Sequence, residues 1–534
     1  MKTQTLLLAL TGQAMCTTLA TDLSVISRHW GQLSPYADNE ENVFGVHDVG
    51  VPEGCGLEQA HVLQRHAQRF GTGEFDDAPN DLAFAEKVAA AIAKTKGKSK
   101  AGFTGSLSFL NKYEYLLSQS YLTGIGATTE FSNGVAFWNK YGRLLYNATV
   151  GQVSYNASSP AALEQKSKPV LRTTSQSRIW NSQISWALGF FGPSYQPITT
   201  PDPTLANWTA PFDVVVIPEG GTENNTLAAY DSCHNDGLEP IIDLGDWDMW
   251  PYVGRYLKAA TARLQPYAPK GFTLTTNDTY AMQSLCAYET AYLGDSAFCK
   301  LFTLDEWAAF EVTLDAEYYF DYSYGNPTGR AQGIGYLQEF IARLTNQYIP
   351  VSNSSVNSTI TNNAKDFPLG AKFYADFSHD DIIISVLAAM SLDYFKDPPN
   401  VKQFPPKRDR RFVLSQMTPF GGHLVAEVYG CASANPVAET EHTTIYSNTA
   451  TTGYSAANAK HKFLRLRLNN GILPLHTIRG GGCAGRTDGL CGVNDFLKSQ
   501  ANATALANYA FACTGNYTLT SPYDGKDYDG TIFA

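Results

Sequence analysis

Two short motifs, far apart in the sequence, contain residue types suited to phosphate chemistry. The first is Arg65-His66-Ala67-Gln68-Arg69, and the second is the dipeptide His379-Asp380. Arginine holds a phosphate well because its planar guanidinium donates two hydrogen bonds at once and keeps its charge. A histidine between two arginines can attack phosphorus, and an aspartate can protonate the departing oxygen. Together the motifs predict the reactive groups of a phosphomonoesterase.

Both motifs, and one further arginine, lie at the ends of predicted strands. Residues 60–64 are typical of a short buried strand before Arg65, residues 372–377 precede His379-Asp380, and residues 169–172 end at Arg172. A fourth strand is predicted at 213–218, where the apolar run is typical of a sheet covered on both faces. Ligands bind at the carboxyl ends of strands in open α/β sheets, so we expect these residues to meet at one edge.

Predicted helices follow the strands. Apolar residues recur at helical spacing in 81–94, 179–191 and 381–392. The last helix starts directly after His379-Asp380, so its free backbone N–H groups would face the same edge and favour an anion there. Near the end of the chain, 464–468 and 472–475 flank Asn469-Asn470-Gly471 and predict a hairpin.

The length of the chain favours two lobes. It has 534 residues, and the stretch 250–345 is rich in Ala, Tyr, Leu and Glu with helical periodicity. We therefore predict an α/β protein with a mixed, mostly parallel sheet, helices on both of its faces, and an inserted, mainly helical smaller lobe. The expected ranges are 21–220 and 346–534 for the α/β catalytic domain and 221–345 for the helical lobe.

Several features indicate export. Residues 1–20 have the basic start, the apolar stretch and the small residues near Ala20 of a signal peptide. Losing Cys16 with this signal leaves an even number of cysteines, which indicates disulfides in an exported chain. No later segment has the apolar length needed to span a bilayer. Acceptor sequons for N-glycans occur at Asn147, Asn156, Asn207, Asn224, Asn277, Asn353, Asn357, Asn502 and Asn516. We expect a secreted, extracellular glycoprotein.

Charge and histidine spacing narrow the function further. The net charge of −11 argues against nucleic-acid binding, which requires a basic face. It also repels anionic substrates at neutral pH, so a phosphate-handling protein of this kind should work better in acid. His423, His461 and His476 lack the spacing of metal ligands, and we expect neither a metal nor a cofactor. The expected partner is a small phosphate monoester, and the oligomeric state is left open.

The chain resembles the histidine acid phosphatases, and within them the secreted fungal phytases. That family has Arg-His-Gly-x-Arg-x-Pro early in the sequence and His-Asp late, which match Arg65–Arg69 and His379-Asp380. Further matching segments run along most of the chain: His29-Trp30-Gly31-Gln32, Arg172 through Gly189, Asn224-Asn225-Thr226-Leu227, Phe302 through Trp307, Tyr324-Gly325-Asn326-Pro327, Gln332 through Tyr336, and Tyr374 through Asp380. The resemblance implies a hydrolase that acts on phosphate monoesters such as inositol hexakisphosphate.

The resemblance also implies a role for each matching residue. His66 matches the nucleophile that forms a phosphohistidine, and Asp380 matches the proton donor. Arg65, Arg69, Arg172 and His379 match the residues that hold the phosphoryl group. The implied disulfides are Cys55–Cys431, Cys233–Cys513, Cys286–Cys299 and Cys483–Cys491.

Some positions depart from the family pattern. Ala67 stands where the family has Gly, Gly71 where it has Pro, and Asp381 where it has Asn. Some phytases carry lysines near the position of Glu317, which bind the outer phosphates of inositol hexakisphosphate. A less basic rim favours a second hypothesis, a broad-specificity acid phosphatase with little phytase activity. A third hypothesis is a catalytically silent relative that serves as a binding or wall protein.

Overall fold

The computed structural model describes residues 18–40, 42–47, 50–73, 77–95, 102–149, 151–165, 167–192, 210–221, 223–437, 453–519 and 527–534. Most of the predicted signal peptide, together with Cys16 and the sequon at Asn207, lies outside these residues. Within them, no helix combines the length and the apolar character needed to cross a membrane.

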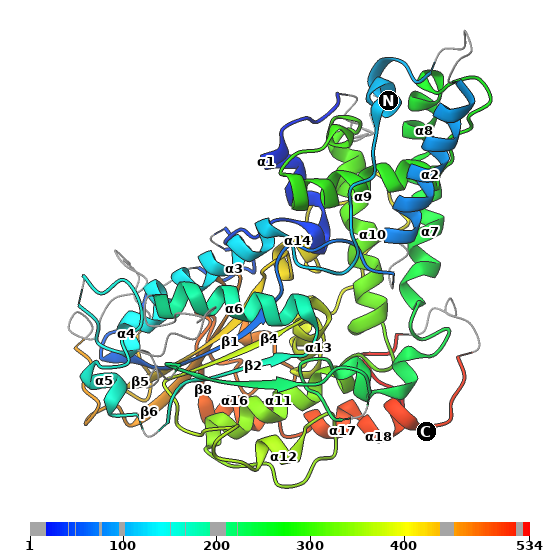
Figure 1. Cartoon of the computed structure of the whole chain (residues 1–534). Helices are drawn as coiled ribbons and strands as arrows, with labels where there is room; N and C mark the ends of the chain where they lie inside the picture. Colours follow the sequence, from blue (N-terminus) through cyan, green and yellow to red (C-terminus); the bar gives the residue numbers. More distant parts are fainter. Residues whose placement is uncertain are drawn as a thin grey trace, which may run out of the picture.

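A mixed sheet lies at the centre of the larger lobe (Figure 1). Its order is β3-β2-β4-β1-β5-β6-β7, and β8 pairs with β6. β4 is parallel to β1 and β2, and β2 is parallel to β3. β5 is antiparallel to β1, and β6 is antiparallel to β5, so β6 runs in the same direction as β1. This arrangement confirms the α/β class and the mixed, mostly parallel sheet. The strands are β1 (Cys55–Arg65), β2 (Val170–Thr174), β3 (Asp213–Ile217), β4 (Phe373–Ser378), β5 (His423–Cys431), β6 (His461–Leu468), β7 (Gly471–Ile472) and β8 (Cys491–Gly492).

Strand ends decide which side chains reach the carboxyl edge of the sheet. β1 ends at Arg65, as predicted, and β4 ends at Ser378, directly before His379. The predicted end of β2 at Arg172 is wrong, because Thr173 and Thr174 continue the strand and pair with β3. Threonine is β-branched and favours extended backbone, so two more residues separate Arg172 from the edge.

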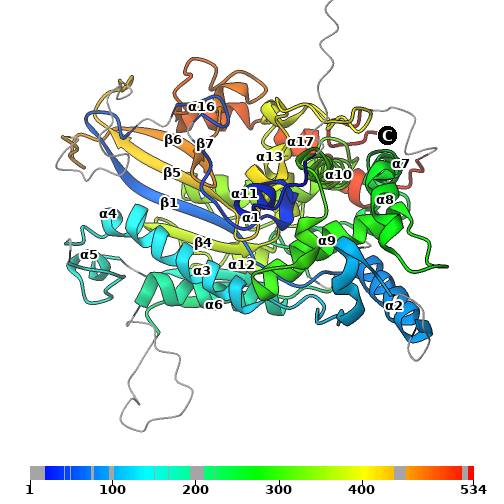
Figure 2. The ribbon, with the colours of Figure 1, turned by 90° about the horizontal axis from the view of Figure 1, so that it is seen from above.

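Helices cover both faces of the sheet (Figure 1). α3 (Gly124–Phe137) and α6 (Ser177–Phe191) lie on one face, while α11 (Gly329–Thr345), α16 (Val493–Ser499) and α17 (Ala503–Ala507) lie on the other. Figure 2 shows α3 and α6 side by side. Gly134 and Gly189 permit this close packing, because a Cβ at either one would lie about 2 Å from a carbonyl oxygen of the facing helix. α13 (Asp380–Ala389) follows β4, contacts β1 and packs against α11.

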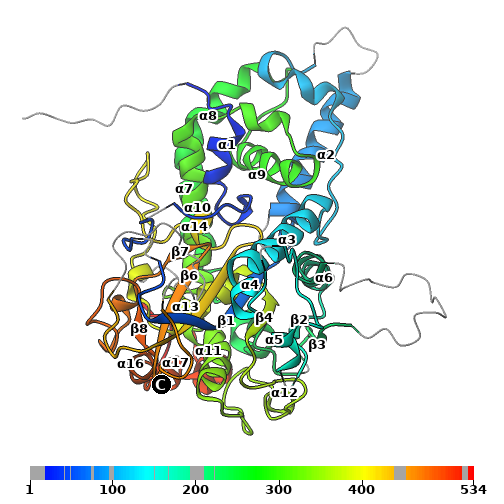
Figure 3. The same ribbon diagram turned by 90° about the vertical axis from the view of Figure 1, so that its left-hand side faces the viewer.

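A group of helices gathers at the other end of the molecule (Figure 3). It contains α7 (Leu244–Tyr256), α8 (Lys258–Leu264), α9 (Thr276–Leu293) and α10 (Leu304–Tyr322). α2 (Asp77–Thr95) precedes the predicted 221–345 insertion yet packs against α9, whereas α11 lies within that range and packs against α13. The boundaries of the two lobes therefore stay a prediction. Short helices complete the described chain: α1 (Leu23–Ile26), α4 (Arg143–Leu145), α5 (Pro160–Leu163), α12 (Ser358–Thr361), α14 (Leu414–Met417) and α18 (Tyr509–Thr514).

The predicted hairpin and the disulfides are present. β6 and β7 pair through a two-residue turn, in which Asn469 and Asn470 both have positive φ, as a tight hairpin turn requires. Four disulfides link distant segments in the pairing that the resemblance implies: Cys55–Cys431, Cys233–Cys513, Cys286–Cys299 and Cys483–Cys491.

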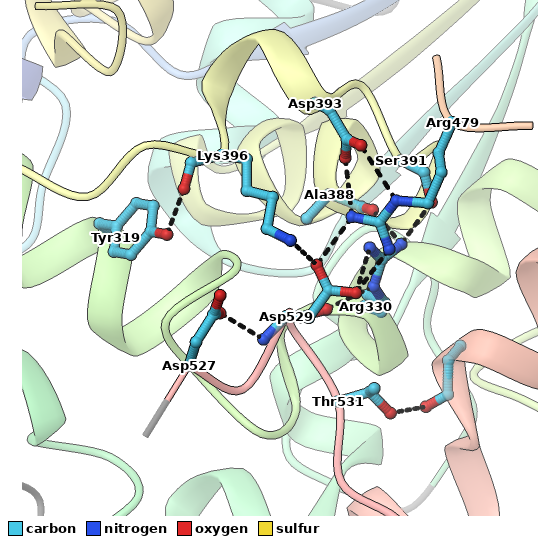
Figure 4. A network of polar contacts seen from close by, with 11 residues as sticks. Tyr319, Arg330, Ala388, Ser391, Asp393, Lys396, Arg479, Asp527, Asp529 and Thr531 are labelled. Atoms are coloured by element: carbon cyan, nitrogen blue, oxygen red, sulfur yellow. Dashed lines mark hydrogen bonds and ion pairs between the residues drawn. The ribbon is translucent and has the colours of Figure 1, made fainter. Parts of the chain in front are cut away.

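Asp529 fastens the C-terminal segment to the body (Figure 4). Arg479 donates to both of its carboxylate oxygens, at 2.5 and 2.8 Å, and Lys396 lies 3.1 Å from one of them. Arg330 of α11, which is wholly buried, lies 3.3 Å from the same carboxylate. The partly buried Asp529 carboxylate thus pairs with cations from three separate parts of the chain.

We expect Asp529→Asn to lower the free energy of unfolding by about 2 kcal/mol, because buried Arg330 loses its counter-charge while the side-chain shape is kept. Thermal and urea denaturation would measure the change. Asp397→Asn is the matched control: its carboxylate is 79% exposed and 3.9 Å from Arg411, so its loss should cost no more than about 0.5 kcal/mol. Equal effects of the two substitutions would contradict this role for Asp529.

Candidate active site

The parallel pairing of β1 and β4 brings the two sequence motifs together. Arg65 is in register with Ser378, so His66 and His379 leave the sheet side by side. Backbone hydrogen bonds fix this arrangement, since His66 N–H donates to the Ser378 carbonyl at 3.2 Å and Gly421 N–H donates to the His66 carbonyl at 3.0 Å. The rings of His66 and His379 lie 5.8 Å apart between their centroids.

A cavity of about 220 Å³ lies at this edge and is lined by two chemically different sets of residues. We name the basic set the basic end, which consists of His66, Arg69, Arg178 and His379. We name the acidic set the acidic wall, which consists of Asp231, Asp236, Asp243, Asp246, Glu317, Asp321 and Asp381. Asp380 also lines the cavity. A larger cavity, of about 670 Å³, lies near His29 and Arg410, but none of the predicted catalytic residues lines it.

His66 is held in the form that a nucleophile needs. Its Nδ1 lies 2.9 Å from the carbonyl oxygen of Ala67, and a carbonyl only accepts, so Nδ1 carries the proton. Nε2 is buried and has no hydrogen-bond partner among the described residues. Burial, followed by the charges of Arg65 and Arg178, lowers the pKa of His66 well below its ordinary value. The imidazole is therefore neutral, with a free lone pair on Nε2.

Ala67 fits at the position where the family has glycine. Its φ is not positive, so the backbone places no demand that only glycine meets. The facing residue is Gly421, with φ +73°, and even a Cβ added there would stay 3.6 Å from the Ala67 methyl group. Neither the backbone conformation nor the neighbouring Gly421 therefore requires glycine at position 67.

Arg65 and Asp380 form a buried ion pair behind the cavity. Arg65 Nη2 lies 2.7 Å from Asp380 Oδ2, and Nη1 donates to the carbonyls of Gln32 and Thr418 at 2.5 and 2.6 Å. Tyr318 donates to the same Asp380 oxygen at 2.8 Å. Burial alone would raise the pKa of Asp380, but the charges of Arg65 and Arg69 and the hydrogen bond from Tyr318 act together to lower that pKa below its ordinary value. Arg65 thus holds Asp380 in place from outside the cavity.

His379 is oriented by a glutamate and a tyrosine. Its Nε2 lies 3.1 Å from Glu219 Oε1 and 3.1 Å from the Tyr230 hydroxyl. Because a carboxylate only accepts hydrogen bonds, Nε2 carries a proton. Burial acts to raise the pKa of Glu219, but the interaction with His379 lowers this pKa to about 2.

The structure does not bring Arg172 to the cavity. Its Nε donates to Asp376 at 2.6 Å and its Nη2 to Glu339 at 2.8 Å, and all three side chains are buried. A different arginine, Arg178 near the start of α6, lines the basic end. Burial and the nearby charge of Arg69 lower the pKa of Arg178, and Arg178 forms no ion pair among the described residues. Two arginines held together in this way are suited to an anion.

Three members of the acidic wall have no neutralising cation among the described residues. Asp236 accepts from Thr328 and Gln332 at 2.8 and 2.6 Å, and Asp321 accepts from Gly245 N–H at 2.7 Å. Asp381 Oδ2 is buried without a partner in the described part of the chain. Burial raises the pKa of Asp236 to about 7 and raises those of Asp321 and Asp381 well above their ordinary value. No group of three or more His, Cys, Asp or Glu residues among those described could hold a metal ion.

Sequence analysis missed several of these residues. Arg178 could have been identified from the sequence. A cation in the first turn of a helix interacts unfavourably with the helix dipole, so a functional role explains its presence there more easily. Glu219, Tyr230, Tyr318 and most of the acidic wall could not have been identified, since they come from separate segments that only tertiary packing brings together.

Comparison with known proteins identifies the family of this chain. Residues 56–449 match the histidine phosphatase superfamily (branch 2), and the chain belongs to that family. Among characterised relatives, Phytase A of Aspergillus fumigatus is 28% identical over 492 residues, which cover 90% of each chain. Phytase A of Aspergillus oryzae is 27% identical and covers 91% of this chain and 90% of its own. The crystal structure of the phytase from D. castellii superposes with a TM-score of 0.66 at 21% identity, covering 95% of this chain and 93% of its own, and therefore shows the same fold.

The two arginines should respond differently to substitution. We expect Arg178→Ala to weaken binding of inorganic phosphate roughly tenfold or more, because a charge-assisted hydrogen bond is lost. Arg172→Ala should instead lower stability by about 3 kcal/mol, because Asp376 and Glu339 lose a buried partner. Calorimetric titration with phosphate and thermal denaturation measure the two effects. A stable Arg172→Ala protein that no longer binds phosphate would reverse the assignment.

Proposed function

We propose that this protein is a secreted acid phosphomonoesterase of the phytase type that acts through a phosphohistidine. The observation that carries the proposal is the buried, unpartnered Nε2 of His66 in a cavity that Arg69, Arg178 and Asp380 also line. The family match and the similarity to fungal phytases support the same activity.

In the first half of the proposed reaction, His66 replaces the alcohol on phosphorus. Arg69, Arg178 and His379 hold the phosphoryl oxygens and offset their charge in the transition state. A bond forms from His66 Nε2 to phosphorus while the bond from phosphorus to the ester oxygen breaks. The electron pair of the broken bond leaves with the ester oxygen, which takes a proton from Asp380.

The proton on Asp380 arrives with the substrate. In the free protein the charge of Arg65 keeps the pKa of Asp380 low, so this residue is a carboxylate. A bound phosphate brings negative charge beside the same arginines and offsets their effect, so Asp380 is protonated more readily in the complex. In the second half, water attacks phosphorus and gives its proton to Asp380. The electron pair of the N–P bond returns to His66, and phosphate is released.

We expect His66→Ala to abolish turnover of 4-nitrophenyl phosphate while the protein stays folded, because the proposed phosphohistidine cannot form without the His66 imidazole. Wild-type protein quenched during turnover should carry a phosphoryl group that is stable in base and labile in acid. Circular dichroism checks the fold of the variant. Normal rates in His66→Ala would rule out the mechanism, and a folded wild type with no activity would favour the silent relative.

The acidic wall favours one variant of this function, a broad-specificity acid phosphatase with little phytase activity. Inositol hexakisphosphate would bring several phosphates besides the one at the basic end, and each would face carboxyl groups rather than lysines. Like charges that meet in a poorly solvated cavity repel strongly. A singly phosphorylated ester avoids most of this repulsion.

The ratio of hexakisphosphate to aryl-phosphate hydrolysis should therefore fall as pH rises from about 5 to about 8. Asp236, whose pKa burial raises to about 7, is neutral on the acid side of this range and ionised at its upper end, and burial also raises the pKa values of Asp321 and Asp381. Rates on both substrates at constant ionic strength measure the ratio. Asp381→Asn should flatten the dependence, and a wild-type ratio that rises with pH would contradict the explanation.

We also propose export and glycosylation. The disulfides are typical of an oxidising compartment. The sequon residues Asn147, Asn156, Asn277, Asn502 and Asn516 are exposed. Asn224 is the exception among exposed sequons, because its amide nitrogen already donates to Ser354 and Val356.

A further inference from the structure

We propose that Tyr318 is a positioning residue for the proton donor: together with Arg65, its hydroxyl group holds Oδ2 of Asp380, so that Oδ1 carries the proton to the leaving alcohol. The proposal rests on the phosphomonoesterase function and adds a residue to which the catalytic steps assign no role. Tyr318 lies in α10, outside both sequence motifs, and it is not among the described residues that line the cavity.

The two carboxyl oxygens of Asp380 have different surroundings. Arg65 Nη2 lies 2.7 Å from Oδ2, and the Tyr318 hydroxyl donates to the same oxygen at 2.8 Å. Both partners are wholly buried, and neither belongs to the described lining of the cavity, although Asp380 does. Oδ2 therefore faces its buried partners, and Oδ1 is the oxygen that they leave for a substrate in the cavity.

The same two contacts disfavour a proton on Oδ2. An arginine donates hydrogen bonds and cannot accept one, so an O–H group on Oδ2 would place its hydrogen among groups that also donate. A proton on Oδ1 leaves both contacts intact. During transfer the O–H bond at Oδ1 breaks, its electron pair stays on the carboxylate, and the proton goes to the ester oxygen. When water later attacks phosphorus, its proton returns to Oδ1.

Packing holds Tyr318 in this position. α10 packs against α7 and contacts α13, the helix that begins at Asp380. The ring centroids of Tyr318 and Tyr322 lie 5.4 Å apart. A tyrosine has only two side-chain torsions, so its hydroxyl is ordered at a small entropic cost. Tyr318 thus gives the carboxyl a second rigid contact, from a helix that the Arg65 contact does not involve.

The effect of the Tyr318 hydroxyl can be separated from the effects of nearby charges. The charged or titratable groups that act on Asp380, besides Tyr318, are Arg65, Arg69, Arg178, His379 and Asp381. The pKa of Tyr318 itself is raised well above its ordinary value, mainly by burial, so its hydroxyl is neutral. Its hydrogen bond helps to lower the pKa of Asp380. Removing the hydroxyl therefore raises the pKa of Asp380 without removing a charge.

The test compares Tyr318→Phe with the unaltered protein on ethyl phosphate and 4-nitrophenyl phosphate as pH is varied. We expect kcat on ethyl phosphate to fall roughly tenfold, because its alcohol needs a well-placed proton, and kcat on the aryl ester to change much less. Asp380 must be protonated in the complex, so activity is lost as pH rises through its pKa. The basic limb of the ethyl phosphate profile should therefore move up by about one pH unit in Tyr318→Phe.

Tyr319→Phe is the matched control. Tyr319 is the next residue of α10, is 3% exposed, and donates to the Lys396 carbonyl at 2.5 Å rather than to Asp380. This control also loses one hydrogen-bonded hydroxyl group from a buried tyrosine, but it should keep the basic limb and the ratio of the two rates. A shift of the limb in Tyr319→Phe as large as in Tyr318→Phe would overturn the positioning role.

Infrared spectra of His66→Ala, with and without inorganic phosphate, separate this proposal from the proposed function. The carboxylic acid band that Asp380→Asn removes should persist to a higher pH, by about one unit, when Tyr318→Phe is added. This shift supports the role of Tyr318 even if the unaltered protein turns nothing over. Turnover of 4-nitrophenyl phosphate by the unaltered protein, with the band and the basic limb unmoved in Tyr318→Phe, would overturn the positioning role and leave the phosphomonoesterase function intact. An equal loss of rate on both esters without a shift would overturn it as well.

Discussion

The buried ion pair between Arg65 and Asp380 is the interaction on which the rest of the site depends. It joins the end of β1 to the start of α13, two segments far apart in the sequence, at a distance of 2.7 Å. Arg65 has no exposed surface, and its Nη1 donates to two backbone carbonyls. Since breaking such a pair costs about 3–5 kcal/mol, the strand, the helix and Asp380 are fixed relative to one another. His66 follows Arg65 directly, so the proposed nucleophile is held in the same rigid position.

The same rigid arrangement gives the adjacent residues Asp380 and Asp381 different surroundings. Asp380 and Asp381 are neighbours in the first turn of α13, but successive residues of a helix point about 100° apart. Asp380 faces Arg65 and Tyr318, and its pKa is lowered, whereas Asp381 belongs to the acidic wall, and burial raises its pKa. In the proposed function Asp380 transfers the proton, whereas Asp381 takes no part in bond breaking. Two neighbouring carboxyls whose pKa values are pushed apart are a common sign of such divided roles.

Sequence reasoning predicted the part of the site that follows from local structure. His66, His379 and Asp380 stand directly after buried strands, and parallel strands end at one edge, so their meeting was predictable. The prediction that Arg172 lies at the end of β2 was wrong, because Thr173 and Thr174 extend this strand beyond its apolar residues. The acidic wall could not be predicted from the sequence. Asp236 accepts hydrogen bonds from Thr328 and Gln332, and nothing in the local sequence of these segments indicates that contact. The packing of α2 on α9 could not be predicted either, because the sequence of α2 indicates only that it forms a helix.

The two sets of residues that line the cavity have different parts in the proposed function. The basic end is proposed to hold the phosphoryl group, which every phosphate monoester shares, so a change there would affect all substrates alike. The members of the acidic wall lie on α10, α13 and the segment before α7, and the proposed bond-breaking steps do not use them. We therefore propose that charges such as those of Glu317 and Asp381 affect which ester is favoured. Single charges can change specificity in such a site, because the proposed proton donor Asp380 is held by Arg65, which does not line the cavity.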